Sequence, residues 1–256
     1  MIAAVDARAE TVGAFFDLDG TLLAAPSLEW RFIGHLLERD EISGGHVGRW
    51  LARFAGDFWH DLHGATVGNK RYLCGISARL VDEWEQSLAL QCCHGDSLAF
   101  FEEALQRIAW HRAQGHRLFI LSGTLAPLAC VVARRLSALN CAEIEVCATE
   151  LEVAPGAARI WNGRIRGEHM SGGAKLRAVT ELAARHGIDL ARSYAYGDSA
   201  GDLQMLEAVG CAVAVNPTRR LARVARKRGW QICAWEKILG EIPDGVARRL
   251  ASKVAR

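Results

Sequence analysis

Short apolar runs rich in β-forming residues recur along the chain and alternate with stretches of helical periodicity. The first run, residues 11–16, stops at Asp17 and the turn-prone Asp19-Gly20, and it predicts a buried strand. Further strands are predicted at residues 117–121, 143–148, 193–196, 212–215 and 230–233. Helices are predicted between most of them, at residues 98–114, 175–186, 202–209 and 219–228. This alternation predicts an α/β fold in which helices cover both faces of a parallel sheet.

One segment departs from the alternation. Between residues 159 and 166, Asn162-Gly163 separates two short pairs that contain apolar residues. Asn-Gly is a typical sequence for a two-residue hairpin turn. We therefore predict a β-hairpin whose turn is Asn162-Gly163.

The chain between the first two predicted strands is far longer than a strand-helix-strand crossover requires, so it contains an insertion. Apolar residues recur there at helical spacing in two sets, Trp50, Phe54 and Phe58 and then Leu80, Trp84 and Leu88. We predict a helical domain at residues 25–95, above the carboxyl end of the first strand, and a core domain formed by residues 1–24 and 96–256. The aromatic residues of the insertion are expected to pack against its own helices rather than to stack on a substrate.

The composition is that of an ordinary globular chain. Of its 256 residues, 50% are hydrophobic and 23% are charged, which excludes a disordered or fibrous protein. The formal net charge is only +2, although the segment from Thr218 to Arg256 carries 11 basic and 3 acidic residues. The basic residues at 219–228 fall on a predicted amphipathic helix, where a solvated outer face is expected. Nucleic acid is therefore not expected as a partner.

The eight cysteines form no Cys-x-x-Cys pair and lie mostly among apolar neighbours, so reduced, structural thiols are expected. The first twelve residues lack the apolar core of a signal peptide, and no apolar stretch reaches the length of a membrane helix. We therefore predict a cytoplasmic protein without a membrane span. The sequence leaves the oligomeric state open.

Polar clusters follow three of the predicted strands, at residues 17–21, 122–124 and 197–202. Ligands bind outside the carboxyl ends of the strands in an open parallel sheet, because loops and helix N-termini meet there. Lys175 begins a predicted helix just after Gly172-Gly173 and is expected at the same edge. Taken singly, Asp17, Asp19 and Ser122 are also typical of turns or helix caps. A single lysine is likewise typical of an exposed surface.

Aspartates gathered at one edge repel one another unless a cation holds them. Oxygen ligands favour a hard divalent ion, most simply Mg²⁺, and the sequence has no cluster of His and Cys at zinc spacing. A lysine, a serine and free backbone N–H groups beside that ion are what a phosphate group requires. The pattern therefore predicts a Mg²⁺ site that accepts a phosphate ester.

The segments FFDLDGTL, LFILSGT and YAYGDSAGD, together with Lys175, resemble the four motifs of the haloacid dehalogenase superfamily, in order and at workable spacing. Three shorter segments resemble its phosphoserine-phosphatase-like branch, HRAQGH at residues 111–116, AVNP at 214–217 and RGW at 228–230. The resemblance implies a Rossmann-like core with the insertion as a type 1 helical cap. It also implies a phosphoric monoester hydrolase.

The resemblance further implies a role for each motif residue. Asp17 would be the nucleophile that forms an aspartyl-phosphate, and Asp19 would protonate the leaving oxygen and then activate water. Mg²⁺ would be held by Asp17, the backbone carbonyl of Asp19 and Asp198, with Asp202 as a supporting acid. The phosphoryl oxygens would be bound by Ser122, Gly123 and Lys175. Asp19 favours a phosphatase over a dehalogenase, since halide leaves without a proton.

Two positions depart from the pattern of phosphoserine phosphatases. Those enzymes carry a glutamate nine residues after the nucleophile to hold the substrate amine, where this chain has Pro26. They also carry an asparagine before the final aspartate of the last motif, where this chain has Gly201. Both departures count against phosphoserine as the substrate. Several polar residues of the insertion are candidates for contacting the rest of a substrate, and the sequence favours none of them: Glu29, Arg31, Arg49, Arg53, His60 and Lys70.

The leading hypothesis is Mg²⁺-dependent hydrolysis of a small organic phosphomonoester, with its physiological identity left open. Two alternatives also remain. One is phosphoryl transfer from the same aspartyl-phosphate to an acceptor other than water. The other is a non-catalytic binding protein that keeps the fold and uses its basic C-terminal segment as a contact surface.

Overall fold

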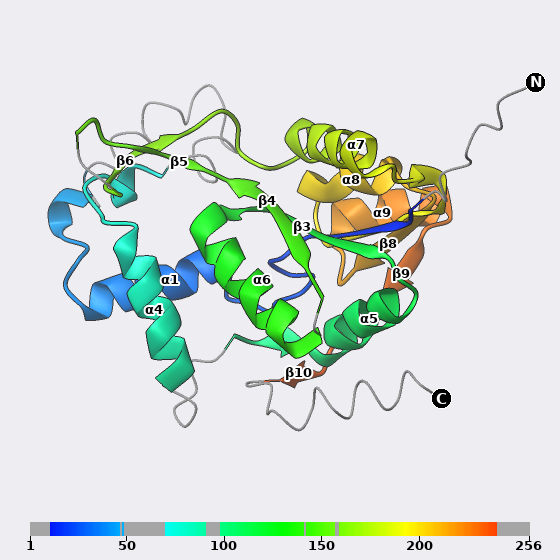
Figure 1. The fold of residues 1–256 in the computed structure, drawn as a ribbon, viewed down its shortest axis with the longest axis horizontal. Helices are drawn as coiled ribbons and strands as arrows, with labels where there is room; N and C mark the ends of the chain where they lie inside the picture. The colour runs from blue at the N-terminus through cyan, green and yellow to red at the C-terminus, as the bar shows by residue number, and fades with distance from the viewer. Residues whose placement is uncertain are drawn as a thin grey trace, which may run out of the picture.

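The computed structural model describes residues 11–46, 48, 70–90, 98–140, 142–156 and 159–239. Six strands form one parallel sheet in the order β4-β3-β1-β7-β8-β9 (Figure 1). Their bounds are β1 Gly13–Phe16, β3 Arg117–Leu125, β4 Ile144–Thr149, β7 Tyr194–Gly197, β8 Cys211–Val215 and β9 Gln231–Cys233. Because β1 lies between β3 and β7, the residues that follow β1 emerge near the centre of the carboxyl edge of the sheet.

Helices cover both faces of this sheet, as the alternation of patterns predicts. They are α5 Glu102–Ala113, α6 Ala126–Asn140, α7 Gly173–His186, α8 Leu203–Glu207 and α9 Arg219–Arg228. Successive residues of β1 point to opposite faces, so Phe15 stacks on Phe119 at 5.0 Å and Phe16 stacks on Tyr196 at 4.5 Å. Phe15 belongs to the core cluster that contains buried residues of α7, α8 and α9, and Phe16 to the cluster that contains buried residues of α5 and α6. The expected α/β fold is confirmed.

Two predicted boundaries differ from the structure. β3 continues through residues 122–124 to Leu125 instead of ending at Leu121, and its register with β4 shifts between Ser122 and Leu125. The helix expected at residues 98–114 begins only at Glu102. The residues before it form β2, Phe100–Phe101, which pairs with β10, Ile238–Leu239. Phe100 and Phe101 fit a buried helix and a buried strand equally well by their apolar character. Pairing with β10 makes them a strand.

The hairpin turn predicted at Asn162-Gly163 is wrong. A hairpin is present, but its strands are β5, Leu151–Val153, and β6, Trp161–Ile165, so both residues lie inside β6. Gly163 has a φ of 76°, and a Cβ there would lie 3.1 Å from the Cα of Arg71. The glycine therefore admits the backbone of the insertion instead of forming a turn.

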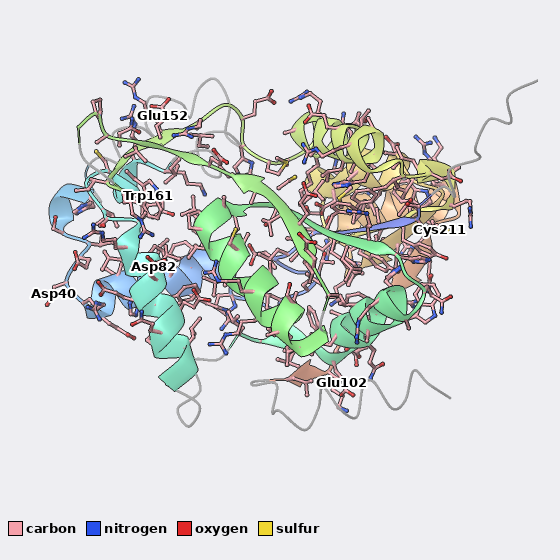
Figure 2. All side chains as sticks on the ribbon, in the orientation of Figure 1. Asp40, Asp82, Glu102, Glu152, Trp161 and Cys211 are labelled. Carbon is pink, nitrogen blue, oxygen red and sulfur yellow. The ribbon has the colours of Figure 1, made fainter. Side chains whose placement is uncertain are left out.

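Within the insertion the structure describes α1 Leu28–Glu38, the short 3-10 helix η1 Arg71–Leu73 and α4 Arg79–Leu90. The rings of Phe32 and Trp84 lie 5.6 Å apart, so α1 and α4 share an apolar core. Trp84 thus packs against a helix of the insertion, as predicted. Figure 2 shows Trp161 and Glu152 of the hairpin at the same end of the molecule as Asp82 of α4, far from Cys211 of β8. Several residues that the sequence selects as helix-packing aromatics or as candidate substrate contacts lie outside the described part of the chain, namely Arg49, Trp50, Arg53, Phe54, Phe58 and His60.

Helix α9 has the amphipathic arrangement expected from its sequence. Leu221, Ala222 and Ala225 are buried, whereas its arginines and lysine are exposed. The five cysteines within the described residues are free thiols, Cys74, Cys130, Cys147, Cys211 and Cys233. No helix in the described ranges has both the length and the apolar character needed to cross a membrane. The basic segment at residues 240–256 lies outside those ranges.

Candidate active site

Asp17 directly follows β1, and a lysine and a second aspartate lie beside it. Lys175 Nζ, in the first turn of α7, donates to Asp17 Oδ1 at 2.6 Å and to Asp202 Oδ1 at 2.5 Å. All three residues are buried, and Lys175 is only 2% exposed. Burial opposes its charge, but the two carboxylates outweigh this effect and raise the pKa of Lys175 above its ordinary value. The ammonium group therefore stays charged inside the protein.

Asp202 holds the loop that follows β7. Its Oδ2 accepts hydrogen bonds from the backbone N–H of Asp198 at 3.2 Å and from the backbone N–H and hydroxyl of Ser199, both at 2.9 Å. The pairing with Ser199 is a capping box at the start of the short helix that includes residues 200–202. One oxygen of Asp202 is thus engaged by this loop and the other by Lys175, so Asp202 positions both groups.

Three carboxylates meet at this edge of the sheet. Oxygens of Asp17, Asp198 and Asp202 lie within 4.8 Å of one another. Burial, followed by repulsion from Asp202, raises the pKa of Asp17 well above its ordinary value and that of Asp198 to about 7. Hard oxygen donors that repel one another in this way fit a divalent cation such as Mg²⁺. Because both oxygens of Asp202 are engaged, Asp17 and Asp198 would hold the ion.

Gly20 lies close to the Asp198 carboxylate. Its φ is 84°, and a Cβ at this position would lie 2.7 Å from Asp198 Oδ2. The left-handed conformation and the missing side chain are both required here. The turn after β1 therefore keeps space for the Asp198 carboxylate.

Asp19 connects the sheet to the insertion. Its Oδ1 accepts from the backbone N–H of Leu28, the first residue of α1, at 2.7 Å, and its Oδ2 accepts from the Thr124 hydroxyl at 2.9 Å. Burial raises the pKa of Asp19, although both hydrogen bonds favour the carboxylate. A raised pKa suits a carboxyl group that donates a proton near neutral pH.

A cavity of about 510 Å³ opens over these groups. It is lined by all seven residues that the sequence selects, Asp17, Asp19, Ser122, Gly123, Lys175, Asp198 and Asp202. Three residues of the insertion, Ser27, Glu29 and Lys70, also line it. Strands β1, β3 and β7 and helices α1 and α7 thus contribute to one hollow of the size that small ligands occupy.

Sequence reasoning gave no role to several lining residues, of which Thr124 and His169 are instructive. Thr124 follows Ser122 by two residues on β3, so strand alternation places both on one face, and this signal was available. His169 packs over the same segment, since a Cβ on Gly123 would lie 2.7 Å from its Cε1. No sequence pattern joins residues 123 and 169, because their contact depends on how the loop before α7 folds.

The family model for haloacid dehalogenase-like hydrolases matches residues 14–207, which span the chain from β1 to α8. The chain belongs to this family. The predicted membership of the haloacid dehalogenase superfamily is thereby confirmed. As a haloacid dehalogenase-like hydrolase it is an enzyme, and the cavity at the carboxyl edge of its sheet is the candidate active site.

Relatives of this haloacid dehalogenase-like hydrolase include proteins named as phosphatases. Phosphoserine phosphatase SerB1 of Mycobacterium tuberculosis is 32% identical over 234 residues, which cover 87% of this chain and 70% of that protein. A probable phosphatase of the same organism is 30% identical over 259 residues and covers 97% of this chain and 84% of its own. A solved protein of unknown function from Bordetella pertussis Tohama I has a TM-score of 0.68 at 23% identity, covering 87% of this chain and 98% of that one, which shows a shared fold.

Proposed function

We propose that the protein is a Mg²⁺-dependent phosphatase that hydrolyses a small organic phosphomonoester through phosphorylated Asp17. The observation that carries this proposal is the Lys175 ammonium bridging Asp17 and Asp202 in the cavity that Asp19 and Asp198 also line. A carboxylate approaches a dianionic phosphate only where cations offset the repulsion. The phosphatase names of the relatives support the same reaction.

In the first half of the reaction, a carboxylate oxygen of Asp17 attacks phosphorus and the ester P–O bond breaks. The Asp19 carboxyl group gives its proton to the leaving alcohol oxygen. Lys175 compensates the negative charge of the phosphoryl group from one side. Ser122 and the backbone of Gly123 would hold the phosphoryl oxygens through hydrogen bonds.

In the second half, water attacks the phosphorus of phospho-Asp17, and the Asp19 carboxylate takes a proton from it. The bond between phosphorus and the Asp17 oxygen breaks, and inorganic phosphate leaves. Asp19 is then protonated again and ready for the next ester. Its bonds to Leu28 and Thr124 keep its side chain oriented in both halves.

Asp17, the backbone carbonyl of Asp19 and Asp198 would hold the Mg²⁺ ion. When bound, Mg²⁺ supplies positive charge that offsets the charge of the phosphoryl oxygens. Asp202 supports the ion indirectly, because its hydrogen bonds to residues 198 and 199 fix the loop.

The test is phosphate release from p-nitrophenyl phosphate by the purified full chain, with and without Mg²⁺. We expect Mg²⁺-dependent turnover that Asp17→Asn abolishes and that Asp19→Asn lowers by roughly 10²- to 10⁴-fold, the usual contribution of a positioned acid or base. Asp40→Asn is the matched control, because Asp40 is exposed at a φ of 57°, where asparagine is equally tolerated. Wild-type rates in Asp17→Asn would reject Asp17 as the nucleophile.

A further inference from the structure

A second polar cluster lines the cavity from the side of the insertion. Lys70 Nζ donates to both carboxylate oxygens of Glu29, at 2.7 and 2.5 Å. The Tyr72 hydroxyl donates to Glu29 Oε1. Glu29 lies in the first turn of α1. Lys70 directly precedes η1, and Tyr72 lies within it. Glu29 and Lys70 line the same cavity as Asp17 and Asp19.

Burial distinguishes this ion pair from others of the insertion. The Lys70 and Glu29 side chains are 6% and 15% exposed, whereas those of Arg39 and Glu83 are 48% and 46% exposed. A buried ion pair contributes little net stability, because desolvation of both charges offsets their attraction. Fold stability alone therefore does not explain why these charges face the cavity. Binding of a ligand would explain it.

The hydrogen bonds of the cluster define which ligand groups it complements. Glu29 already receives an ammonium group from Lys70, so a substrate amine would have to displace a cation that the chain itself provides. A substrate carboxylate would meet an ammonium whose charge Glu29 already neutralises. Lys70 has three N–H donors, and Glu29 accepts two hydrogen bonds from it, so one donor remains. The Glu29 carboxylate also keeps lone pairs that can accept further hydrogen bonds. The cluster thus offers both donor and acceptor capacity without net charge.

A neutral hydroxyl group both donates and accepts, and it requires no countercharge. We propose that Glu29 and Lys70, held by Tyr72, bind a neutral hydroxyl on the leaving alcohol, so that the enzyme selects phosphate esters of polyhydroxylated alcohols over those of amino alcohols. This inference rests on the phosphatase function proposed above, and it assigns the substrate class of the same cavity. Burial, together with Glu29, raises the pKa of Tyr72, so its phenol remains a donor.

Four two-carbon esters that differ in one group test the inference: 2-hydroxyethyl phosphate, phosphoethanolamine, phosphoglycolate and ethyl phosphate. We expect the full-length enzyme to show a kcat/KM for 2-hydroxyethyl phosphate about 10-fold or more above each of the other three, because loss of a paired hydroxyl leaves buried polar groups unsatisfied. Values equal within about threefold, or a preference for phosphoethanolamine, phosphoglycolate or ethyl phosphate, would overturn the inference.

Variants then assign the preference to the cluster. Lys70→Met leaves the Glu29 carboxylate without its cation, so the ratio of kcat/KM for phosphoethanolamine to that for 2-hydroxyethyl phosphate should rise about 10-fold or more. The charge-neutral double variant Glu29→Gln with Lys70→Met should lose the discrimination among the four esters and serves where the single variant fails to fold. The exposed pair changed in the same way, Arg39→Met with Glu83→Gln, is the control and should keep the wild-type ratios. Unchanged ratios in both cluster variants would overturn the assignment.

The p-nitrophenyl phosphate assay separates this failure from a failure of the proposed function. Turnover of p-nitrophenyl phosphate without discrimination among the four esters removes only the substrate class. No turnover of p-nitrophenyl phosphate or of any of the four esters removes the phosphatase function, and the substrate class falls with it.

Discussion

Lys175 carries a full charge inside the protein, and the two carboxylates that accept its hydrogen bonds make this burial tolerable. Removal of Lys175 would leave the two buried carboxylates without their cation, which is strongly destabilising. Asp17, Lys175 and Asp202 therefore form one unit. Effects of single substitutions among them on turnover will not add, as is usual for residues that act together.

The space that Gly20 leaves for Asp198 predicts that adding one methyl group at position 20 lowers activity. Gly20→Ala places a Cβ 2.7 Å from Asp198 Oδ2, so the carboxylate must move. We expect Mg²⁺-dependent turnover to fall by about 100-fold or more, comparable to the loss of a major transition-state contact. Initial rates and the Mg²⁺ concentration for half-maximal activity measure this.

Gly115→Ala is the control for backbone strain alone. Gly115 has a φ of 73° and no atom within 4 Å of its missing Cβ, so both variants bear the same kind of strain, on the order of 1 kcal/mol. Both melting temperatures should fall, that of Gly20→Ala by more because of its contact with Asp198, while only Gly20→Ala should lose activity. Equal activities in the two variants would contradict the crowding of Asp198.

At the scale of elements, α5 is joined to the sheet by a buried polar contact. His111 of α5 is fully buried, and its Nε2 lies 2.8 Å from the hydroxyl of Tyr196 on β7. Its Nδ1 lies 2.8 Å from Nδ1 of His116, and this contact requires one ring nitrogen to donate and the other to accept. The pair therefore holds one proton between these two atoms, and a second proton there breaks the contact.

This contact predicts a loss of stability in acid. Burial, followed by the charges of His116 and Arg107, lowers the pKa of His111 to about 3, below the ordinary value of 6.5. The unfolded chain then binds the proton first, so the free energy of unfolding falls as the pH falls from about 6.5 towards 3, by up to about 1.4 kcal/mol per pH unit. Urea unfolding at pH 6.5, 6.0, 5.5 and 5.0 measures it.

His111→Gln isolates this contribution from that of the carboxylates, because glutamine does not titrate and the other groups are common to both proteins. Wild type should lose stability relative to the variant as the pH falls. Parallel curves for the two proteins across this range would show that His111 binds its proton equally well in the folded state.

At the scale of the molecule, the carboxylate cluster connects metal binding to global stability. An ion that binds only the folded state stabilises it by about 1.4 kcal/mol at ten times its dissociation constant. We therefore expect Mg²⁺ to raise the melting temperature by a few degrees, with a smaller rise in Asp198→Asn. NaCl at equal ionic strength and the Asp40→Asn protein are the controls. A rise of the same size with NaCl would mean that Mg²⁺ acts only by screening charge.

The sequence predicts what depends on local pattern. Each of the six core strands coincides with a predicted strand, and the apolar runs are clearest in inner strands such as β1, because burial on both faces of a parallel sheet selects apolar residues. The carboxyl ends of parallel strands meet at one edge of the sheet. This rule is sufficient to predict that Asp17, Ser122 and Asp198 lie together, since each follows a strand or lies near its end.

Contacts between distant segments are what the sequence does not predict. Glu29 and Lys70 are 41 residues apart and meet only because η1 packs near the start of α1. Asn162-Gly163 has turn chemistry, but the short strand Leu151–Val153 pairs with the segment and the insertion packs on Gly163. In both cases tertiary packing overrides or adds to the local signal.

The hydrogen bond from Leu28 to Asp19 has a consequence for how such an enzyme diverges. The backbone N–H of Leu28 is anchored on the residue that would deliver the proton, so a change that removes this N–H, such as Leu28→Pro, should lower turnover whatever the ester. Lys70 comes from a separate stretch of chain and contacts neither Asp19 nor Asp17 through any described hydrogen bond. Natural variation that creates new selectivity is therefore expected to accumulate at positions 29 and 70, whereas proline is expected to be absent from position 28.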